Sequence, residues 1–161
     1  MSIRVVQEAL DRWSDQGDQV AVATLISVRR SAPLPPGSRF AVSSTGEFVG
    51  SISSGCVEGD LHERLLAILD GQAPETVTYG ITDEMAAGVG LSCGGEIDVL
   101  LDIHDPTDPA WCRLLTLIET GDPGVLLTGS GSMTRSHRLL LTLKESIGTL
   151  GSETLDDLAR D

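Results

Sequence analysis

Two short segments of the sequence place a cysteine beside glycines: residues 50–59 contain Cys56, and residues 90–96 contain Cys93. Glycine has no Cβ, so backbone N–H groups in such segments can approach a ligand closely. Thiols in this setting suit soft metals, sulfur transfer or a cofactor dithiolene. The two segments therefore raise the hypothesis of one divided site.

The first segment spans a position where a predicted strand ends and a predicted helix begins. Unpaired N–H groups and a positive macrodipole at a helix start favour a thiolate and accept an anion such as phosphate. Gly55 and Gly59 on either side of Cys56 would let a ligand or another strand come close. The alternative is that Glu58 and Asp60, in the first turn, satisfy the same dipole without a ligand, with Cys56 a small packed residue.

The second segment is less specific, because Cys93 followed by Gly94 and Gly95 is also typical of a tight turn before a strand. The third cysteine, Cys112, falls on a predicted helix next to Trp111 and is assigned to packing or to the surface. The three cysteines form no CxxC pair, which indicates thiols rather than a disulfide framework. Zinc is disfavoured, because no histidine has ligand spacing with them.

Charge and hydropathy restrict the partners. The net charge is −13, so nucleic acid and anionic membranes are not expected partners. No apolar run approaches the roughly 20 residues of a membrane helix, and the N-terminus lacks a signal pattern, so the expected location is the cytoplasm. Three arginines, Arg29, Arg30 and Arg39, lie close together in sequence. They could supply local positive charge to an anionic ligand, or form a solvated group at a strand end.

The spacing of apolar residues predicts the elements that position these segments. We expect helices over 2–14, 57–69 and 152–160, with a further helix that begins at Thr107-Asp108-Pro109. Ser2 is the expected cap of the first helix. Strands are expected over 20–28, 39–43, 47–52, 75–79 and 96–102, and the prolines of residues 32–37 predict a loop.

The second part of the sequence echoes the first. Gly121-Asp122 and the strand after it resemble Gly17-Asp18 and residues 20–24, and residues 138–141 and 147–150 resemble 39–42 and 49–52. We interpret the chain as one domain with an internal α-β-β-β-α repeat: residues 1–70, linking strands in 71–106, and a second copy in 107–161. The predicted class is α+β, with a mixed, mainly antiparallel sheet flanked by helices. The second copy has no cysteine at its helix start.

The order and spacing of several pieces resemble the XdhC/CoxI family, the accessory factors of xanthine dehydrogenase and carbon monoxide dehydrogenase. The pieces are Gly17-Asp18, Ser31-Ala32-Pro33, Pro36-Gly37-Ser38-Arg39, residues 50–59 and Gly90-Leu91-Ser92-Cys93-Gly94-Gly95. The resemblance implies a non-catalytic chaperone that holds the molybdenum cofactor (molybdopterin) while its sulfido ligand is installed, then delivers it to a molybdenum hydroxylase.

The same resemblance implies the site. Gly55, Cys56, Glu58, Gly59, Cys93, Gly94 and Gly95 would bind the cofactor, with Cys56 and Cys93 near the molybdenum and Arg39 on the phosphate. Implied partners are the hydroxylase client, a cysteine desulfurase or a separate dinucleotide-fold protein, and a second copy of the chain. The family's second, dinucleotide-fold domain is expected to be absent from this chain.

Two departures and two alternatives accompany the resemblance. Arg30 begins a stretch that reads Gly-Ser-Ala-Pro-Arg in the family, so that Leu34 stands where the family has an arginine, and Ser54 replaces a glycine of the Gly-Gly-Cys form. The alternative functions are a thiol-dependent sulfur-transfer or redox enzyme that uses Cys56 with Cys93, and a docking module that binds the hydroxylase without holding the cofactor.

Overall fold

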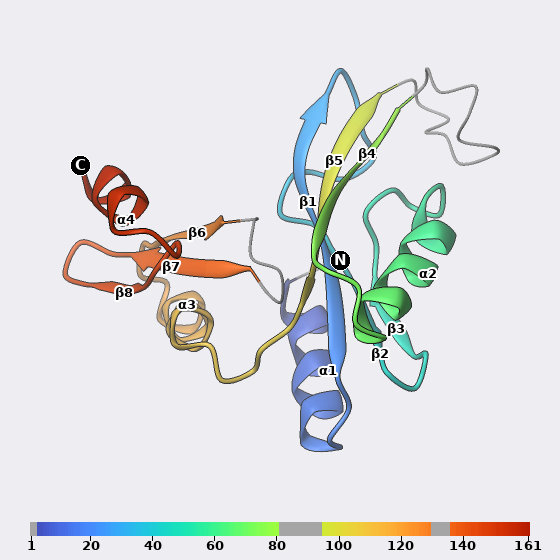
Figure 1. Ribbon diagram of the computed structural model, residues 1–161, viewed down its shortest axis with the longest axis horizontal. Coiled ribbons are helices and arrows are strands. Elements are labelled where there is room, and N and C mark those ends of the chain that lie inside the picture. The colour runs from blue at the N-terminus through green and yellow to red at the C-terminus, as the bar shows by residue number, and fades with distance from the viewer. Residues whose placement is uncertain (1–2, 81–94, 130–135) are drawn as a thin grey trace. The chain divides into compact units, whose positions relative to one another are not determined.

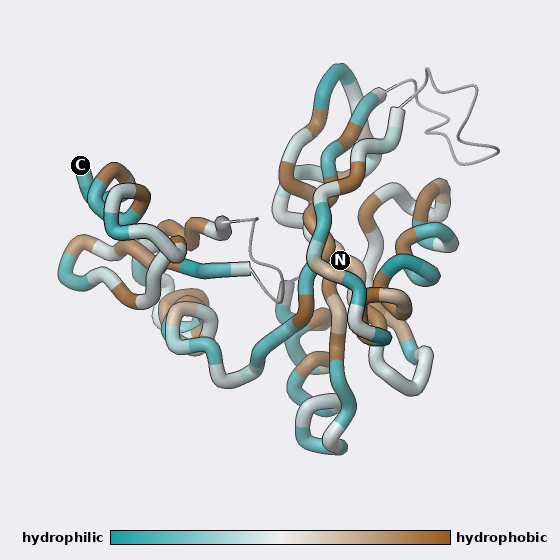
Figure 2. The backbone as a smooth tube through the Cα atoms, viewed as in Figure 1, coloured by the Kyte–Doolittle hydropathy of each residue, from teal (hydrophilic) through white to brown (hydrophobic). Residues whose placement is uncertain are grey.

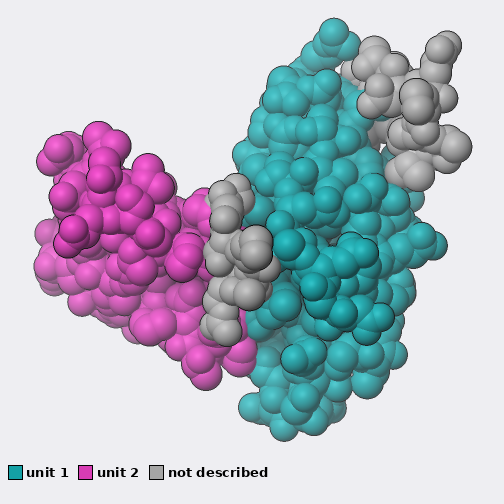
Figure 3. Space-filling model, in the orientation of Figure 1, with its two compact units in different colours: residues 1–104 teal, residues 105–161 magenta. Residues whose placement is uncertain are grey.

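A computed structural model of the 161-residue chain describes residues 3–80, 95–129 and 136–161 (Figure 1). The chain divides into two compact units, residues 1–104 and residues 105–161, which Figure 3 colours separately. The expected α+β class is confirmed, with the strands in two sheets. Ser2, the expected cap of the first helix, lies outside the described residues, as do Cys93 and Gly94. Within the described ranges, no helix has the length and apolar content needed to cross a bilayer.

The first unit is built on a five-stranded sheet in the order β3-β2-β1-β5-β4, and each of its strand pairs is antiparallel. In chain order its elements are α1 (Ile3–Asp15), β1 (Val20–Arg29), β2 (Arg39–Ser43), β3 (Phe48–Gly50), α2 (Glu58–Leu69), β4 (Glu75–Tyr79) and β5 (Glu96–Ile103).

Strand β1 is apolar on both faces because a helix covers each side of the sheet. Val20 and Val22 pack with α1 in one cluster, while Ala21 and Leu25 pack with α2 in another. Figure 2 shows the hydrophobic colour along this strand, between the two helices. Burying a side chain of this size stabilises a fold by about 1.5–3 kcal/mol. The buried strand predicted at residues 20–28 is confirmed as β1.

The second unit has a smaller sheet, β6-β7-β8, again with antiparallel pairs. Its elements are α3 (Pro109–Thr120), β6 (Val125–Gly129), β7 (His137–Leu141), β8 (Ser146–Gly148) and α4 (Glu153–Arg160). The predicted start of α3 is confirmed: the Asp108 carboxylate accepts a hydrogen bond from the Trp111 N–H at 3.0 Å, and Pro109 occupies the first turn.

The two hairpins share one register. Thr24 pairs with Arg39 and Phe40 with Gly50 in the first unit, while Thr128 pairs with Arg138 and Leu139 with Gly148 in the second. The internal repeat remains an interpretation of the sequence, to which these shared registers add support.

One strand boundary was predicted wrongly. The sequence predicts a strand through Ile52, but β3 ends at Gly50, where φ is +93°. At that point the Cβ of any other residue would overlap the carbonyl oxygen of Arg39, and the chain turns away from β2. The residues after Gly50 form the loop that precedes α2.

Candidate functional site

The loop of residues 51–57 joins β3 to α2 and contains Cys56. Its first residue stays attached to the sheet, because the Ser51 N–H donates to the carbonyl of Arg39 at 2.9 Å. Ser54 and Gly55 then have φ values of +62° and +113°, which curl the backbone back on itself. The loop therefore forms a tight ring whose N–H groups converge on one point.

That point is occupied by the carboxylate of Glu58, the first residue of α2. One oxygen, Oε1, accepts from the hydroxyl of Ser51 at 2.6 Å and from the N–H groups of Ile52 and Ser53 at 2.9 and 2.8 Å. The other, Oε2, accepts from the Ser53 hydroxyl at 2.6 Å and from the N–H groups of Gly55 and Val57 at 2.8 and 3.3 Å. The Glu58 carboxylate therefore serves as the anion at the start of α2.

These donors keep Glu58 ionised. Burial by itself would raise the pKa of Glu58, but the hydroxyls of Ser51 and Ser53 and the N–H groups of Ser53 and Ile52 outweigh it and lower the pKa to about 2. The alternative read from the sequence was that Glu58 and Asp60 satisfy the start of α2 without a ligand. In the structure Glu58 accepts from the loop, whereas the Asp60 carboxylate accepts from Tyr79 and Arg64.

Cys56 lies between the two peptide groups that bind Oε2. Its side chain is partly buried and packs against the main core of the first unit, as do Ala32 and Leu34 of the proline-rich loop. At Gly59, by contrast, a Cβ would meet no atom within 4 Å. The thiol is therefore partly exposed at the edge of the core, three residues before Gly59.

A polar cluster that the sequence analysis missed connects α2 to the end of β4. The Asp60 carboxylate accepts from the Tyr79 hydroxyl at 2.6 Å and from Arg64 Nε at 2.7 Å. Burial, and then the bond to Asp60, raise the pKa of Tyr79. The i,i+4 spacing of Asp60 and Arg64 could have revealed that pair, but the contact with Tyr79 spans 19 residues and has no local signal.

The second cysteine-glycine segment is described from Gly95 onward. Gly95 is buried, and a Cβ there would overlap the carbonyl oxygen of Ser31, so only glycine allows this approach to the chain just after β1. Arg30, the residue before Ser31, has φ +70°. Ser54, one of the two family departures, and Arg30, which aligns with the first glycine of the family's Gly-Ser-Ala-Pro-Arg stretch, therefore both stand where the backbone favours glycine.

The three arginines do not act as one positive group. Arg29 is paired with Glu96 and with Asp98, the latter at 2.9 Å, so its charge is compensated within the sheet. Arg30 is exposed, and Arg39 is partly buried at the start of β2, where its carbonyl receives the Ser51 N–H. Of these residues, Arg39 is the one that directly adjoins the loop of Cys56.

The structure thus gathers Arg39, Cys56 and Glu58 around one loop, with Gly55 within it and Gly59 on the next helical turn. Gly95 belongs to the same unit but contacts Ser31. Cys93 and Gly94 lie outside the described residues, so the proximity of Cys56 and Cys93 remains a prediction. No group of three or more metal-ligating side chains occurs within the part of the chain that the structure describes.

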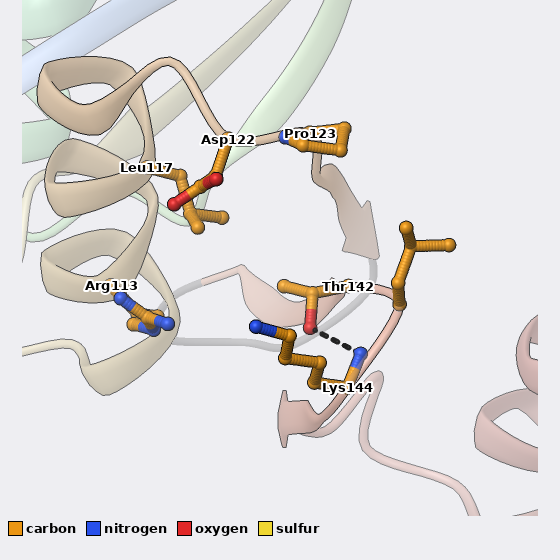
Figure 4. Close-up of a pocket in the computed structure, with 7 residues that line it drawn as sticks. Arg113, Leu117, Asp122, Pro123, Thr142 and Lys144 are labelled. Atoms are coloured by element: carbon orange, nitrogen blue, oxygen red, sulfur yellow. Dashed lines mark hydrogen bonds between the residues drawn. The ribbon is translucent and has the colours of Figure 1, made fainter.

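A separate hollow of about 110 Å³ lies in the second unit, between α3 and the β7–β8 turn (Figure 4). It is lined by Arg113, Leu117, Asp122, Pro123, Thr142, Leu143 and Lys144. Arg113 is bound to Glu145 at 2.7 Å, and the Lys144 N–H donates to the Thr142 hydroxyl at 3.1 Å. None of the residues predicted from the sequence to form a site lines this hollow.

Comparison with known proteins places the loop of Cys56 in a family. Residues 13–80, which include Arg39 and the whole loop, match the model of the XdhC and CoxI family. The chain contains an XdhC and CoxI family segment. The resemblance stated from the sequence motifs is thereby confirmed.

Two relatives extend the comparison beyond the XdhC and CoxI segment. A protein of Bacillus subtilis (strain 168), described as a probable xanthine dehydrogenase subunit, is 25% identical over 154 residues, which are 94% of this chain and 46% of that protein. A crystal structure described as a xanthine dehydrogenase from Bacillus halodurans superposes with a TM-score of 0.67 at 24% identity, covering 90% of this chain and 45% of that one. This chain spans about half the length of each, and the structural likeness shows the shared fold.

Proposed function

We propose that this chain is an accessory factor of a molybdenum hydroxylase of the xanthine dehydrogenase type. In this role it binds the molybdenum cofactor and assists its sulfuration and its insertion into the hydroxylase. The family match over residues 13–80 and the description of the Bacillus subtilis relative support the accessory role. The binding and sulfuration of the cofactor are the proposed part.

The observation that carries the proposal is the setting of Cys56. Its partly exposed thiol lies within the family segment, in a loop whose shape is held by Glu58. A thiol is a soft ligand that suits a molybdenum–sulfur centre. A loop held in one shape by many hydrogen bonds can present a partly exposed thiol without a large rearrangement.

The residues fit one part of the cofactor better than another. When bound, molybdopterin supplies a dithiolene-held metal and a phosphate. Cys56 suits the metal end, whereas the loop's N–H groups are not offered to the phosphate, because the Glu58 carboxylate already accepts from them. In the proposal, Arg39 at the base of the loop therefore holds the phosphate through its guanidinium.

The proposed partners follow from the same role. They are the hydroxylase client, a cysteine desulfurase or a separate dinucleotide-fold protein, and a second copy of the chain. A thiol-dependent sulfur-transfer enzyme and a pure docking module remain the competing hypotheses. Unchanged activation of the hydroxylase by a Cys56→Ala, Cys93→Ala double variant would favour the docking module.

The test is stoichiometric retention of molybdopterin by the purified chain under anaerobic conditions. Molybdenum and pterin are measured per chain after gel filtration, for the wild type, for Cys56→Ala and for Cys112→Ala. Cys112 is exposed on α3 in the other unit and serves as the matched thiol control. The proposal predicts about one cofactor per chain for the wild type and for Cys112→Ala, and a large loss for Cys56→Ala. A wild-type chain that retains none would contradict it.

A further inference from the structure

The loop of residues 51–57 has the geometry of an anion cradle, but its anion is part of the chain. Four N–H groups and two hydroxyls converge on the Glu58 carboxylate. We infer that Glu58 is the positioning residue for Cys56: it fills the cradle, fixes how the loop presents the thiol, and prevents an external anion from binding there. The inference deepens the proposed function, on which the role of Cys56 toward a ligand rests.

The contacts that matter most flank the cysteine. The N–H groups of Gly55 and Val57, the residues before and after Cys56, both donate to Oε2 of Glu58. Val57 also donates to the Ser53 hydroxyl at 3.0 Å, and that hydroxyl donates to the same carboxylate. Since Val57 is fully buried, the cysteine is held between a carboxylate-bound peptide on one side and an anchored core residue on the other.

Only an ionised carboxylate can serve all six donors. An ionised carboxylate has two oxygens that only accept, and here each oxygen accepts from three donors. A glutamine of the same length would turn an NH₂ group toward donors and leave some of them unpaired. Because the pKa of Glu58 is about 2, the side chain is charged throughout the neutral range.

The middle of the loop, at Ser54 and Gly55, is exposed, whereas Ile52, Ser53 and Val57 are buried. At Gly55 a Cβ would meet no atom within 4 Å, so neighbouring side chains do not confine the backbone there. Val57, the N-cap residue of α2, makes no side-chain capping hydrogen bond. The carboxylate of Glu58, the first helical residue, accepts from the N–H groups of the loop instead. Removing the carboxylate should therefore loosen the loop around Cys56 while the sheet and the body of α2 remain.

The test measures how fast iodoacetamide alkylates Cys56. The tryptic peptide 40–64 contains Cys56 as its only cysteine, and peptide 65–113 contains Cys93 and Cys112 as internal references. We expect Cys56 to be alkylated about five- to thirty-fold faster in Glu58→Ala than in the wild type, because loss of the carboxylate makes local opening of the loop more frequent. Glu63→Ala, an exposed glutamate on the same helix, is the matched control and should react at the wild-type rate.

Rescue by a small carboxylate separates positioning from general destabilisation. Formate can enter the space left in Glu58→Ala and accept the same hydrogen bonds, so it should return the rate toward that of the wild type. Sodium chloride at equal ionic strength should not. Glu58→Gln should also react faster, but without rescue, because its side chain still fills the cradle. It is the variant to use if Glu58→Ala does not fold. A wild-type rate in both Glu58 variants, or equal rescue by chloride, would overturn the inference.

Inorganic phosphate gives a second readout. Amide resonances of residues 52–57 should not shift when phosphate is added to the wild type, and they should shift in Glu58→Ala. Phosphate-induced shifts of these amides in the wild type would show that the cradle accepts an external anion after all. Neither experiment contains molybdopterin, so the inference can hold even if cofactor retention fails, and the two failures are distinguishable.

Discussion

The loop before α2 and the loop before α4 begin in the same way and end differently. Each follows a hairpin that closes on a glycine, Gly50 or Gly148, with φ near +90°. The next residue, Ser51 or Thr149, donates its N–H to an arginine carbonyl at 2.9 or 2.8 Å. Its hydroxyl then binds a carboxylate seven residues further on, Glu58 in the first unit and Asp156 in the second.

The two loops differ in how much that carboxylate holds. Asp156 accepts from the Thr149 hydroxyl at 2.7 Å and from the Leu150 N–H at 2.6 Å. Glu58 makes the corresponding contacts and adds the donors of residues 53–57, the stretch that contains Cys56. Its longer side chain reaches the centre of a wider ring. The two loops therefore share the contacts of their first two residues with the carboxylate. The first loop has additional donors in residues 53–57, around Cys56.

The helices that follow differ as well. In α2, Leu61, Leu65 and Ile68 are buried in the core, whereas in α4 Leu155 and Leu158 are exposed and Asp156 is the buried residue. A helix that buries one apolar face gains most of its stability from that packing. The first unit can therefore support a strained loop better than the second.

The largest effect is expected from substituting the positive-φ glycine that precedes each of the two loops. Alanine at Gly50 or at Gly148 would place a Cβ on the carbonyl oxygen of Arg39 or Arg138, at a φ that L-residues avoid. We expect each substitution to lower the free energy of unfolding of its own unit by about 3 kcal/mol. Hydrogen exchange read by mass spectrometry on peptides from each unit would measure the effect.

The control for this comparison is a glycine with the same φ and no collision. Gly46 and Gly121 have φ values of +86° and +75°, and a Cβ at either would meet no atom within 4 Å. Alanine there should cost only about 1 kcal/mol, the ordinary penalty of a left-handed conformation. If Gly50→Ala costs no more than Gly46→Ala, the close approach to Arg39 is not what shapes the loop.

A smaller effect is a difference in the pH at which Glu58 and Asp156 lose their contributions to stability. The pKa of Glu58 is lowered from 4.5 to about 2 on folding, so its contribution is complete above pH 4.5 and is lost as the pH falls toward 2. Because the side chain is only partly buried, this contribution is about 1–2 kcal/mol after screening by water. The N–H of Leu150 and the hydroxyl of Thr149 also lower the pKa of Asp156 below 3.8, so its loss begins at a lower pH.

The measurement is urea unfolding of the wild type and of Glu58→Gln between pH 7 and pH 2. Other carboxylates with lowered pKa values, such as Asp60 and Asp98, titrate in both proteins and cancel in the difference. The difference in stability between the two should shrink as the pH falls below 4.5. A difference that stays constant down to pH 2 would mean that the ionised carboxylate is not what the loop requires.

Much of this arrangement could be predicted from the sequence, because its signals are local. Apolar spacing predicted the four helices, and the run of residues 20–28 predicted β1. Asp108 and Pro109 marked a helix start, and Gly55, Cys56 and Glu58 were assigned together to one candidate site. The positions of Glu58 and Asp60 also suggested that these two carboxylates could satisfy the start of α2 without a ligand.

The remainder depends on contacts that no local pattern contains. The end of β3 at Gly50 follows from the nearby Arg39 carbonyl on a neighbouring strand, and the bond from Tyr79 to Asp60 follows from how β4 packs beside α2. The number of donors that reach Glu58 depends on positive φ values at Ser54 and Gly55. A serine in the sequence does not predict a positive φ, since glycine is the residue that normally adopts it.

The smallest expected effect concerns that serine. Ser54 has φ +62°, and its N–H donates to the hydroxyl of Ser51, three residues earlier, at 2.9 Å. In the second loop Gly151 has φ +84°, and its N–H donates to the hydroxyl of Thr149, two residues earlier, at 2.9 Å. Ser54→Gly should relieve the left-handed strain, offset in part by the greater freedom of glycine in the unfolded chain. The expected gain in the free energy of unfolding is about 0.5 kcal/mol.

The opposite change at the positive-φ glycine of the second loop, Gly151→Ser, should lower the stability of the second unit by more than Ser54→Gly raises that of the first. A Cβ at Gly151 would lie 2.8 Å from Cδ2 of His137, so collision adds to strain, whereas the loop at Ser54 already accommodates its Cβ. Urea unfolding followed by hydrogen exchange in each unit measures both. If Ser54→Gly instead loosens residues 51–57, the serine itself helps to hold the ring around Glu58, and the first loop then differs from the second in its backbone as well as in its carboxylate.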